Sequence, residues 1–133
     1  MSYRCAFLGC GPRARGHAKA YQLITRGEIV ALCDMNEARL NDFGETFGVT
    51  TRYTDLDEML RKEKPDVVHM VTPPTIRHSL MARLAEAGVP GVIIEKPVCI
   101  GADDYKALRD LEARSETRFV VNHQLRHHPR ILE

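Results

Sequence analysis

The chain has 133 residues, of which 44% are hydrophobic and 28% are charged, and its formal net charge is +1. This is the composition of an ordinary globular domain, and it excludes disordered and collagen-like chains. A charge balance so close to neutral provides no general attraction to phosphate backbones or anionic lipids, so we expect neither a nucleic-acid partner nor a membrane. No apolar run approaches the roughly 20 residues that a membrane-spanning helix needs.

Short apolar runs alternate along the chain with segments of helical period, which is typical of a parallel sheet flanked by helices. Five runs are nearly uninterrupted by polar residues, which predicts strands covered on both faces. These are 3–8, 29–33, 67–71, 92–95 and 118–121, and a weaker run at 50–53 is a sixth candidate. Six strands suit an α/β, doubly wound (Rossmann), mostly parallel sheet with helices on both faces and strand order 3-2-1-4-5-6.

The helices between these strands are predicted from apolar spacing. A stripe at i, i+4, i+7 and i+10 runs from Ala14 to Ile24 and predicts one amphipathic helix. Further stripes predict helices over 56–60, 80–87 and 105–111. Asp55 is placed to cap the first of these three, and Gly88 is placed to end the second.

A glycine-rich turn joins the first predicted strand to the first helix. The motif consists of Gly9, Cys10, Gly11, Pro12, Arg13 and Ala14. It matches G-x-G-x-x-G/A, which indicates dinucleotide binding when a strand precedes it and a helix follows it. Gly9 would form the tight turn, Gly11 would let a diphosphate approach the backbone, and Ala14 would let the helix pack closely on the sheet. The alternative is a glycine-bearing turn without a ligand.

Asp34 ends the second predicted strand, 25 positions after Gly9. An acidic residue about 20 positions beyond the first glycine hydrogen-bonds the ribose hydroxyls of NAD, and its carboxylate would repel the 2′-phosphate of NADP. We therefore expect NAD, with NADP as the alternative because Arg39 is close in sequence. The simpler roles for Arg39 are to stack on the adenine or to remain in solvent. Asp34 would otherwise only cap a helix that begins at Asn36.

Two proline-containing motifs end later strands, at the carboxyl edge where open α/β sheets bind ligands. They are Thr72-Pro73-Pro74 and Glu95-Lys96-Pro97. Because successive strand residues face opposite sides, Glu95 and Lys96 cannot pair across one face, and one of them must point toward the ligand crevice. A lysine there would hydrogen-bond a substrate hydroxyl or carbonyl and assist proton transfer. The alternative is an exposed lysine at a strand terminus.

Together these motifs resemble the Gfo/Idh/MocA oxidoreductases, the family of glucose-fructose oxidoreductase and inositol dehydrogenase. The resemblance runs from Tyr3 to about Ile131, and the Glu-Lys-Pro element is its most specific part. Besides the motifs above, it rests on Gly16-His17, His78, Ala87-Gly88, Asn122, Arg126 and Pro129. The family's Thr-Pro-Asn is replaced by Thr-Pro-Pro here, which removes a side-chain hydrogen bond at Pro74.

The resemblance implies an NAD(P)-dependent dehydrogenase that acts on a sugar, cyclitol or related polyol. It implies that Lys96 is the catalytic residue beside nicotinamide and substrate, and that the peptide before Pro97 is cis. His17 and His78 fall near the cofactor cleft, where a structural histidine is the alternative. The cofactor-binding residues expected from the motifs and the resemblance are Gly9, Cys10, Gly11, Pro12, Arg13, Ala14, Asp34, Arg39, Thr72, Pro73, His78, Glu95, Lys96, Pro97 and Arg126.

The resemblance also predicts the domain organisation. We expect residues 1–122 to form the dinucleotide-binding domain and 123–133 to begin a connection to a second, substrate-binding domain that this chain lacks. The chain alone is then expected to bind dinucleotide without catalysis, and to self-associate as a homo-oligomer through uncovered apolar surface. Two other hypotheses are a regulatory or sensor module for NAD(H), and an S-adenosylmethionine-dependent transferase, which has no use for the Glu-Lys-Pro element.

The four cysteines predict the cellular compartment. Cys5, Cys10, Cys33 and Cys99 form no C-x-x-C pair and have no histidine at zinc-finger spacing, so we expect free thiols and no metal site. A secreted chain would organise its cysteines in disulfides. The apolar stretch before Cys10 is too short for a signal-peptide core of about 7 to 15 residues. We therefore expect a cytoplasmic protein.

Overall fold

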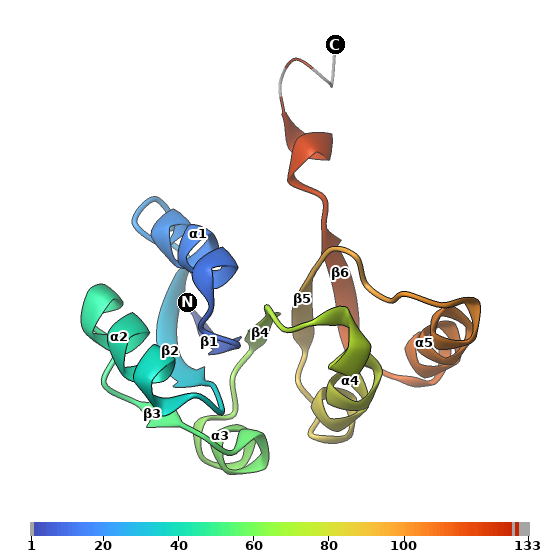
Figure 1. The fold of residues 1–133 in the computed structure, drawn as a ribbon, viewed down its shortest axis with the longest axis horizontal. Coiled ribbons are helices and arrows are strands. Elements are labelled where there is room, and N and C mark those ends of the chain that lie inside the picture. Colours follow the sequence, from blue (N-terminus) through green and yellow to red (C-terminus); the bar gives the residue numbers. More distant parts are fainter. Residues whose placement is uncertain (1, 129, 131–133) are drawn as a thin grey trace.

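Six strands form one sheet in the order β3-β2-β1-β4-β5-β6 (Figure 1). The strands are β1 (Tyr3–Leu8), β2 (Gly27–Cys33), β3 (Arg52–Tyr53), β4 (Val67–Met70), β5 (Gly91–Glu95) and β6 (Arg118–Asn122). Every pairing between neighbours is parallel, which confirms the predicted doubly wound topology. The computed structural model describes residues 2–128 and 130, so Pro129 and Ile131, on which part of the family resemblance rests, lie outside the described residues.

Five α-helices connect the strands. They are α1 (Pro12–Ala20), α2 (Glu37–Phe47), α3 (Leu56–Glu63), α4 (Arg77–Glu86) and α5 (Ala102–Arg114), with short 3-10 turns η1 (Pro74–Ile76) and η2 (Gln124–His127). The Asp55 carboxylate accepts from the Glu58 N–H at 2.7 Å, which confirms the predicted cap of α3. Gly88 follows α4 with a φ of 71°, as expected for a helix end. Within residues 2–128 and 130, no helix has the length and apolar character needed to cross a bilayer.

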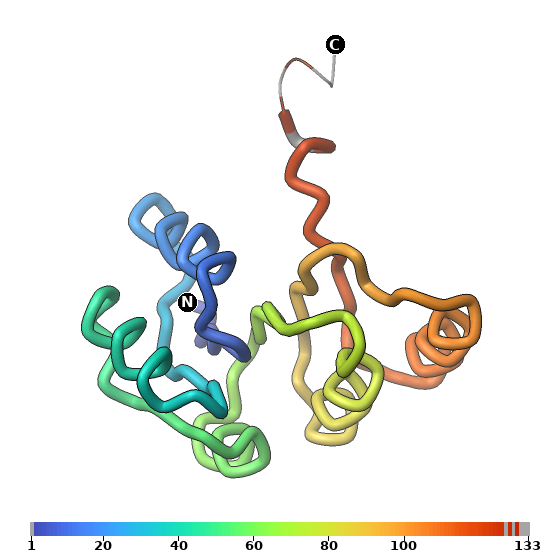
Figure 2. The backbone as a smooth tube through the Cα atoms, in the orientation of Figure 1, coloured from blue at the N-terminus to red at the C-terminus, as the bar shows by residue number. Residues whose placement is uncertain are grey.

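The helices divide between the two faces of the sheet. On the α3–α5 face, these three helices pack on a continuous apolar cluster contributed by β1, β2, β4 and β5. On the α1–α2 face, a smaller apolar cluster joins α1 and α2 to β1 and β2. Figure 2 follows the chain through two halves that meet where β4 pairs with β1. All four cysteines are free, as predicted.

Two expectations about these elements were wrong. The apolar stripe from Ala14 to Ile24 predicts one helix, but α1 ends at Ala20. The amides of residues 21–23 bond to carbonyls three residues back, and this tighter winding rotates the following side chains away from the stripe. The prediction that every strand is covered on both faces was also wrong. β6 is an edge strand, and its Val120 remains 49% exposed.

Candidate functional site

The glycine turn after β1 is pressed against the end of β4. Gly9 has a φ of 93° and donates its N–H to the Cys33 carbonyl oxygen at 2.8 Å. A Cβ at this position would lie 2.4 Å from the Val71 carbonyl oxygen. Only glycine meets both conditions without strain, so the structure supports the tight-turn role expected for Gly9.

The start of α1 is open for an anion. Gly11 stands at the N-cap position, no side chain caps the helix, and Pro12 is its first residue. A Cβ on Gly11 would have no neighbour within 4 Å, so there is room for a ligand against the backbone. The first N–H groups of a helix lack intrahelical partners and carry the positive end of its dipole. This arrangement fits a diphosphate group.

Asp34 is a buried carboxylate at the end of β2, only 7% exposed. It accepts the Cys10 N–H at 2.8 Å and the Asn36 N–H at 2.8 Å, and Arg39 donates to both of its oxygens at 2.9 and 2.8 Å. Burial by itself would raise the pKa of Asp34, but these hydrogen bonds outweigh it and hold the pKa below its usual value. Asp34 is therefore charged at neutral pH.

The Arg39 side chain is 49% exposed, in agreement with the expected position in solvent, and its guanidinium also forms a two-point ion pair with Asp34 that the sequence did not indicate. The planar fork of arginine matches a carboxylate in this way. The helix cap is provided by Asn36, whose side chain accepts the Arg39 N–H at 2.9 Å. Asp34 is thus left to bind the glycine turn.

A cleft of about 660 Å³ opens between the glycine turn, the end of β2 and the loop after β4. Eight of the predicted cofactor-binding residues line it: Gly9, Gly11, Pro12, Arg13, Asp34, Arg39, Thr72 and Pro73. Met35, Ile76 and Leu80 add apolar walls. The Thr72 Oγ1 is buried and has no hydrogen-bond partner among the described residues. A buried hydroxyl without a partner is costly, so a bound polar group would satisfy it.

The other predicted residues lie outside this cleft: Cys10, Ala14, His78, Glu95, Lys96, Pro97 and Arg126. The side chains of Cys10 and Ala14 are fully buried in the apolar cluster of the α1–α2 face. His78 on α4 and Arg126 in η2 are exposed. Lys96 is exposed just after β5, and the peptide that joins it to Pro97 is cis, as the resemblance implied.

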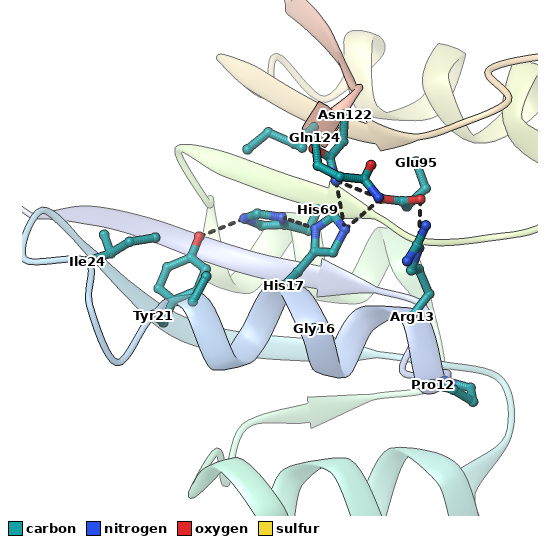
Figure 3. Close-up of a pocket in the computed structure, with 12 residues that line it drawn as sticks. Pro12, Arg13, Gly16, His17, Tyr21, Ile24, His69, Glu95, Asn122 and Gln124 are labelled. Carbon is teal, nitrogen blue, oxygen red and sulfur yellow. Dashed lines mark hydrogen bonds and ion pairs between the residues drawn. The ribbon is translucent and has the colours of Figure 1, made fainter. Parts of the chain in front are cut away.

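The Glu95 side chain points toward α1 on the α1–α2 face, where Figure 3 shows it beside Arg13 and His17. It is 3% exposed, and it accepts from Arg13 Nε at 3.1 Å and from Asn122 Nδ2 at 2.7 Å. The His17 Nε2 lies 2.8 Å from its Oε1. Burial would raise the pKa of Glu95, but the contacts with His17, Asn122 and Arg13 lower it below its usual value. One carboxylate therefore joins α1, β5 and β6 directly before Lys96.

The polar contacts continue from His17 into a second cavity of about 690 Å³ (Figure 3). The Nδ1 atoms of His17 and His69 are 3.2 Å apart, and the Tyr21 hydroxyl lies 2.7 Å from His69 Nε2. Burial and the neighbouring His17 lower the pKa of His69 to about 3, so its ring is neutral near pH 7. Arg13 lines both this cavity and the cleft, which places the two side by side.

Sequence reasoning missed several members of this region. His69 interrupts an otherwise apolar strand, and that interruption was the one signal that a polar group is buried there. Tyr21 was assigned to an apolar stripe, although its hydroxyl bonds to His69. Arg77 is 3% exposed at the start of α4, and nothing in the local sequence indicated that an arginine would be buried at that position.

The sequence model described as "Oxidoreductase family, NAD-binding Rossmann fold" (Gfo/Idh/MocA) matches residues 3–123. The chain belongs to this family. It is 34% identical over 129 residues to D-apiose dehydrogenase of Paraburkholderia graminis, a match that covers 97% of this chain and 34% of the relative. It is 33% identical to D-glucoside 3-dehydrogenase of Escherichia coli, with 80% of this chain and 30% of the relative covered.

Two solved structures have the same fold as this chain. The WlbA dehydrogenase from Bordetella pertussis, in complex with NADH and UDP-GlcNAcA, superposes with a TM-score of 0.91 at 26% identity. That match covers 99% of this chain and 40% of the dehydrogenase. An oxidoreductase from Agrobacterium radiobacter, in complex with NAD+, L-tartaric acid and magnesium, gives a TM-score of 0.88 at 26% identity, covering 95% and 36%. The Gfo/Idh/MocA chain thus spans about a third of the curated relatives that it matches.

Proposed function

We propose that the cleft binds NAD, with the diphosphate at the start of α1 and the adenosine ribose on Asp34. The observation that carries this proposal is the bond between Asp34 and the Cys10 N–H, which holds an acidic residue against the glycine turn. The space at Gly11 and the unpaired Thr72 hydroxyl support it. NAD is preferred over NADP, because the charged Asp34 repels a 2′-phosphate and its ion pair occupies Arg39.

The proposed reaction of the whole protein is hydride transfer between nicotinamide and a carbinol carbon of a sugar, cyclitol or related polyol. The relatives named as sugar dehydrogenases support this substrate class. When bound, NAD supplies the hydride chemistry at its nicotinamide ring. Lys96 would assist the proton on the substrate oxygen, and its exposed position after β5 leaves the ammonium free to reach one. His78, Pro97 and Arg126 remain proposed contacts of the cofactor.

The rest of the proposal concerns the chain by itself. It spans about a third of its curated relatives, and we propose that the substrate-holding residues belong to the remainder of the whole protein. The 133-residue chain is then expected to bind dinucleotide without producing NADH from a polyol. Exposed Val120 and Leu125 provide apolar surface through which copies would associate. A cytoplasmic location remains part of the proposal.

Calorimetric titration with NADH and NADPH tests the cofactor assignment. The unmodified chain is expected to bind NADH more tightly than NADPH. Asp34→Asn should weaken NADH binding by roughly 10- to 100-fold, because a hydrogen bond to a charged group contributes about 1.5–3 kcal/mol. The substitution should also reduce the ratio of NADH affinity to NADPH affinity, because Arg39 is released from its ion pair and can contact a 2′-phosphate.

The control is Asp103→Asn on α5, whose side chain is fully exposed and remote from the cleft. It should bind both dinucleotides as the unmodified chain does. Absence of NADH binding by the unmodified chain would refute the assignment. Equal affinities of the Asp34→Asn variant and the unmodified chain would remove Asp34 from the site.

A further inference from the structure

Arg77 is a buried arginine that bonds only to main-chain oxygens among the described residues. It is the first residue of α4 and is 3% exposed. Its Nε and Nη2 donate to the Thr72 carbonyl oxygen at 3.0 and 2.6 Å. Its Nη1 donates to the carbonyl oxygens of Glu95 and Pro97. One guanidinium thus connects the loop after β4 to the loop after β5.

This placement is unfavourable for stability on two counts. A buried cation loses its hydration, and Arg77 forms no ion pair with any carboxylate of the described residues. The burial lowers the pKa of its guanidinium. It also lies in the first turn of a helix, where the dipole disfavours positive charge. An apolar side chain at this position would avoid both costs. The arginine therefore contributes something that an apolar residue cannot, namely its hydrogen bonds to the main-chain carbonyls of the two loops.

The two connected loops carry the residues that the proposed site needs. Thr72 lines the cleft and holds the unpaired hydroxyl. Glu95 and Pro97 are the immediate neighbours of Lys96, so their carbonyl contacts hold the backbone on both sides of the lysine. The flat guanidinium has five donors in a fixed plane and can serve several acceptors at once, which an ammonium on a flexible stem does less well.

We propose that Arg77 is a positioning residue that holds the Thr72 loop, which lines the cleft, and the Lys96 loop, which lies outside it, at a fixed distance from each other. The inference rests on the proposed dinucleotide function. It adds a residue that contacts neither the diphosphate turn nor Asp34 and acts only through main-chain atoms. Loss of the guanidinium should leave the fold intact and let the two loops move independently.

The test uses Arg77→Lys and Arg77→Met, with Arg109→Met on the exposed side of α5 as the matched control. NADH affinity is measured by calorimetry, and amide hydrogen exchange at 72–77 and 95–99 is followed by NMR. Both Arg77 variants should bind NADH about tenfold more weakly, because neither side chain can bond to the carbonyls of both loops at once, while Arg109→Met binds normally. Exchange should accelerate in these two loops and remain unchanged in β1. In a third variant, Arg77→Ala, added methylguanidinium should restore part of the affinity, because it can occupy the vacated guanidinium position and bond to the same carbonyls.

Several outcomes would overturn the proposal. Unchanged NADH affinity in folded Arg77→Lys and Arg77→Met would do so, as would a global loss of structure in both. If the unmodified chain binds no NADH, the proposed function fails, and the exchange data then decide about Arg77. Loop protection retained in the variants would refute the positioning role, and protection lost only in the two loops would support it.

Discussion

The two faces of the sheet are stabilised in different ways. On the α3–α5 face, alternate residues of β1, β2, β4 and β5 are apolar and form one continuous cluster with three helices. On the α1–α2 face, the apolar cluster stops at β1 and β2. Over β4 to β6 the same face carries His69, Glu95 and Asn122, which bond to each other or to α1.

The α3–α5 face therefore mainly stabilises the fold, whereas the polar half of the α1–α2 face mainly positions the elements beside the cleft. Apolar burial is non-directional and carries no charge, so the α3–α5 face should stabilise the fold equally at any moderate pH. Hydrogen bonds are directional, so the polar half of the α1–α2 face holds α1 and the end of β5 in a defined relation beside the cleft. Because its members titrate, that half should respond to acid. Three substitutions test this contrast.

The largest effect is expected for Leu84→Ala on the α3–α5 face. Leu84 is fully buried in α4, and deletion of a buried leucine side chain typically lowers the free energy of unfolding by about 2–5 kcal/mol. Urea unfolding should give the same loss at pH 7 and pH 5.5, because no titrating group is removed. Leu23→Ala, at a position 89% exposed, should change the unfolding free energy by less than about 0.5 kcal/mol. A loss for Leu84→Ala that depends on pH would contradict the contrast.

Glu95→Gln should have the next largest effect, because it keeps the side-chain shape and removes the charge that Arg13 and His17 contact. We expect the free energy of unfolding at pH 7 to fall by roughly 1–3 kcal/mol. Because the native pKa of Glu95 is below its ordinary value of 4.5, this stabilisation is present above pH 4.5 and disappears as the pH falls through the native pKa. Unmodified chain and variant should therefore converge in acid. Equal unfolding free energies at pH 7 would show that the charge has no role, and exposed Glu112→Gln is the control.

The smallest effect near pH 7 is expected at His69, where it is seen as a slope of the unfolding free energy with pH. Burial and His17 lower the pKa of His69 to about 3 in the native chain. The imidazole therefore becomes protonated near pH 6.5 in the unfolded chain but stays neutral in the native chain until a much lower pH. The free energy of unfolding should thus decrease as the pH falls from 6.5 toward 3, by up to about 1.4 kcal/mol per pH unit from this residue. Urea titrations of His69→Gln at pH 7, 6 and 5 should give a flatter dependence. The same slope in His69→Gln as in the unmodified chain would rule the effect out, and exposed His123→Gln should keep that slope.

Much of the fold was predictable because burial repeats with the period of each element. The apolar runs located all six strands within a few residues, and Asp55 and Gly88 marked helix ends through their own local chemistry. The same reasoning failed after Ala20, where apolar spacing continued although the backbone changed to a tighter turn. It also left α2 without a predicted end, since only its start at Asn36 was considered.

The candidate site, like the fold, has some features that the sequence predicted and others that only the structure shows. Gly9, Asp34 and Thr72 were placed correctly in one cleft, because the ends of parallel strands meet at one edge of a sheet. The direction of Glu95 was left open between the two faces, and the structure turns it toward α1. Its partners are 27 to 82 residues away in sequence, so no local pattern could specify them.

The amino-acid sequence by itself determined a parallel α/β sheet and the juxtaposition of a glycine turn with Asp34. Both follow from regular backbone geometry and from conformational demands that single residues carry. Only the tertiary structure decided that Arg39 closes on Asp34, that Glu95 joins three elements and that Arg77 connects two loops. A buried polar group must find partners wherever packing brings them, and the choice among distant partners belongs to the folded chain as a whole.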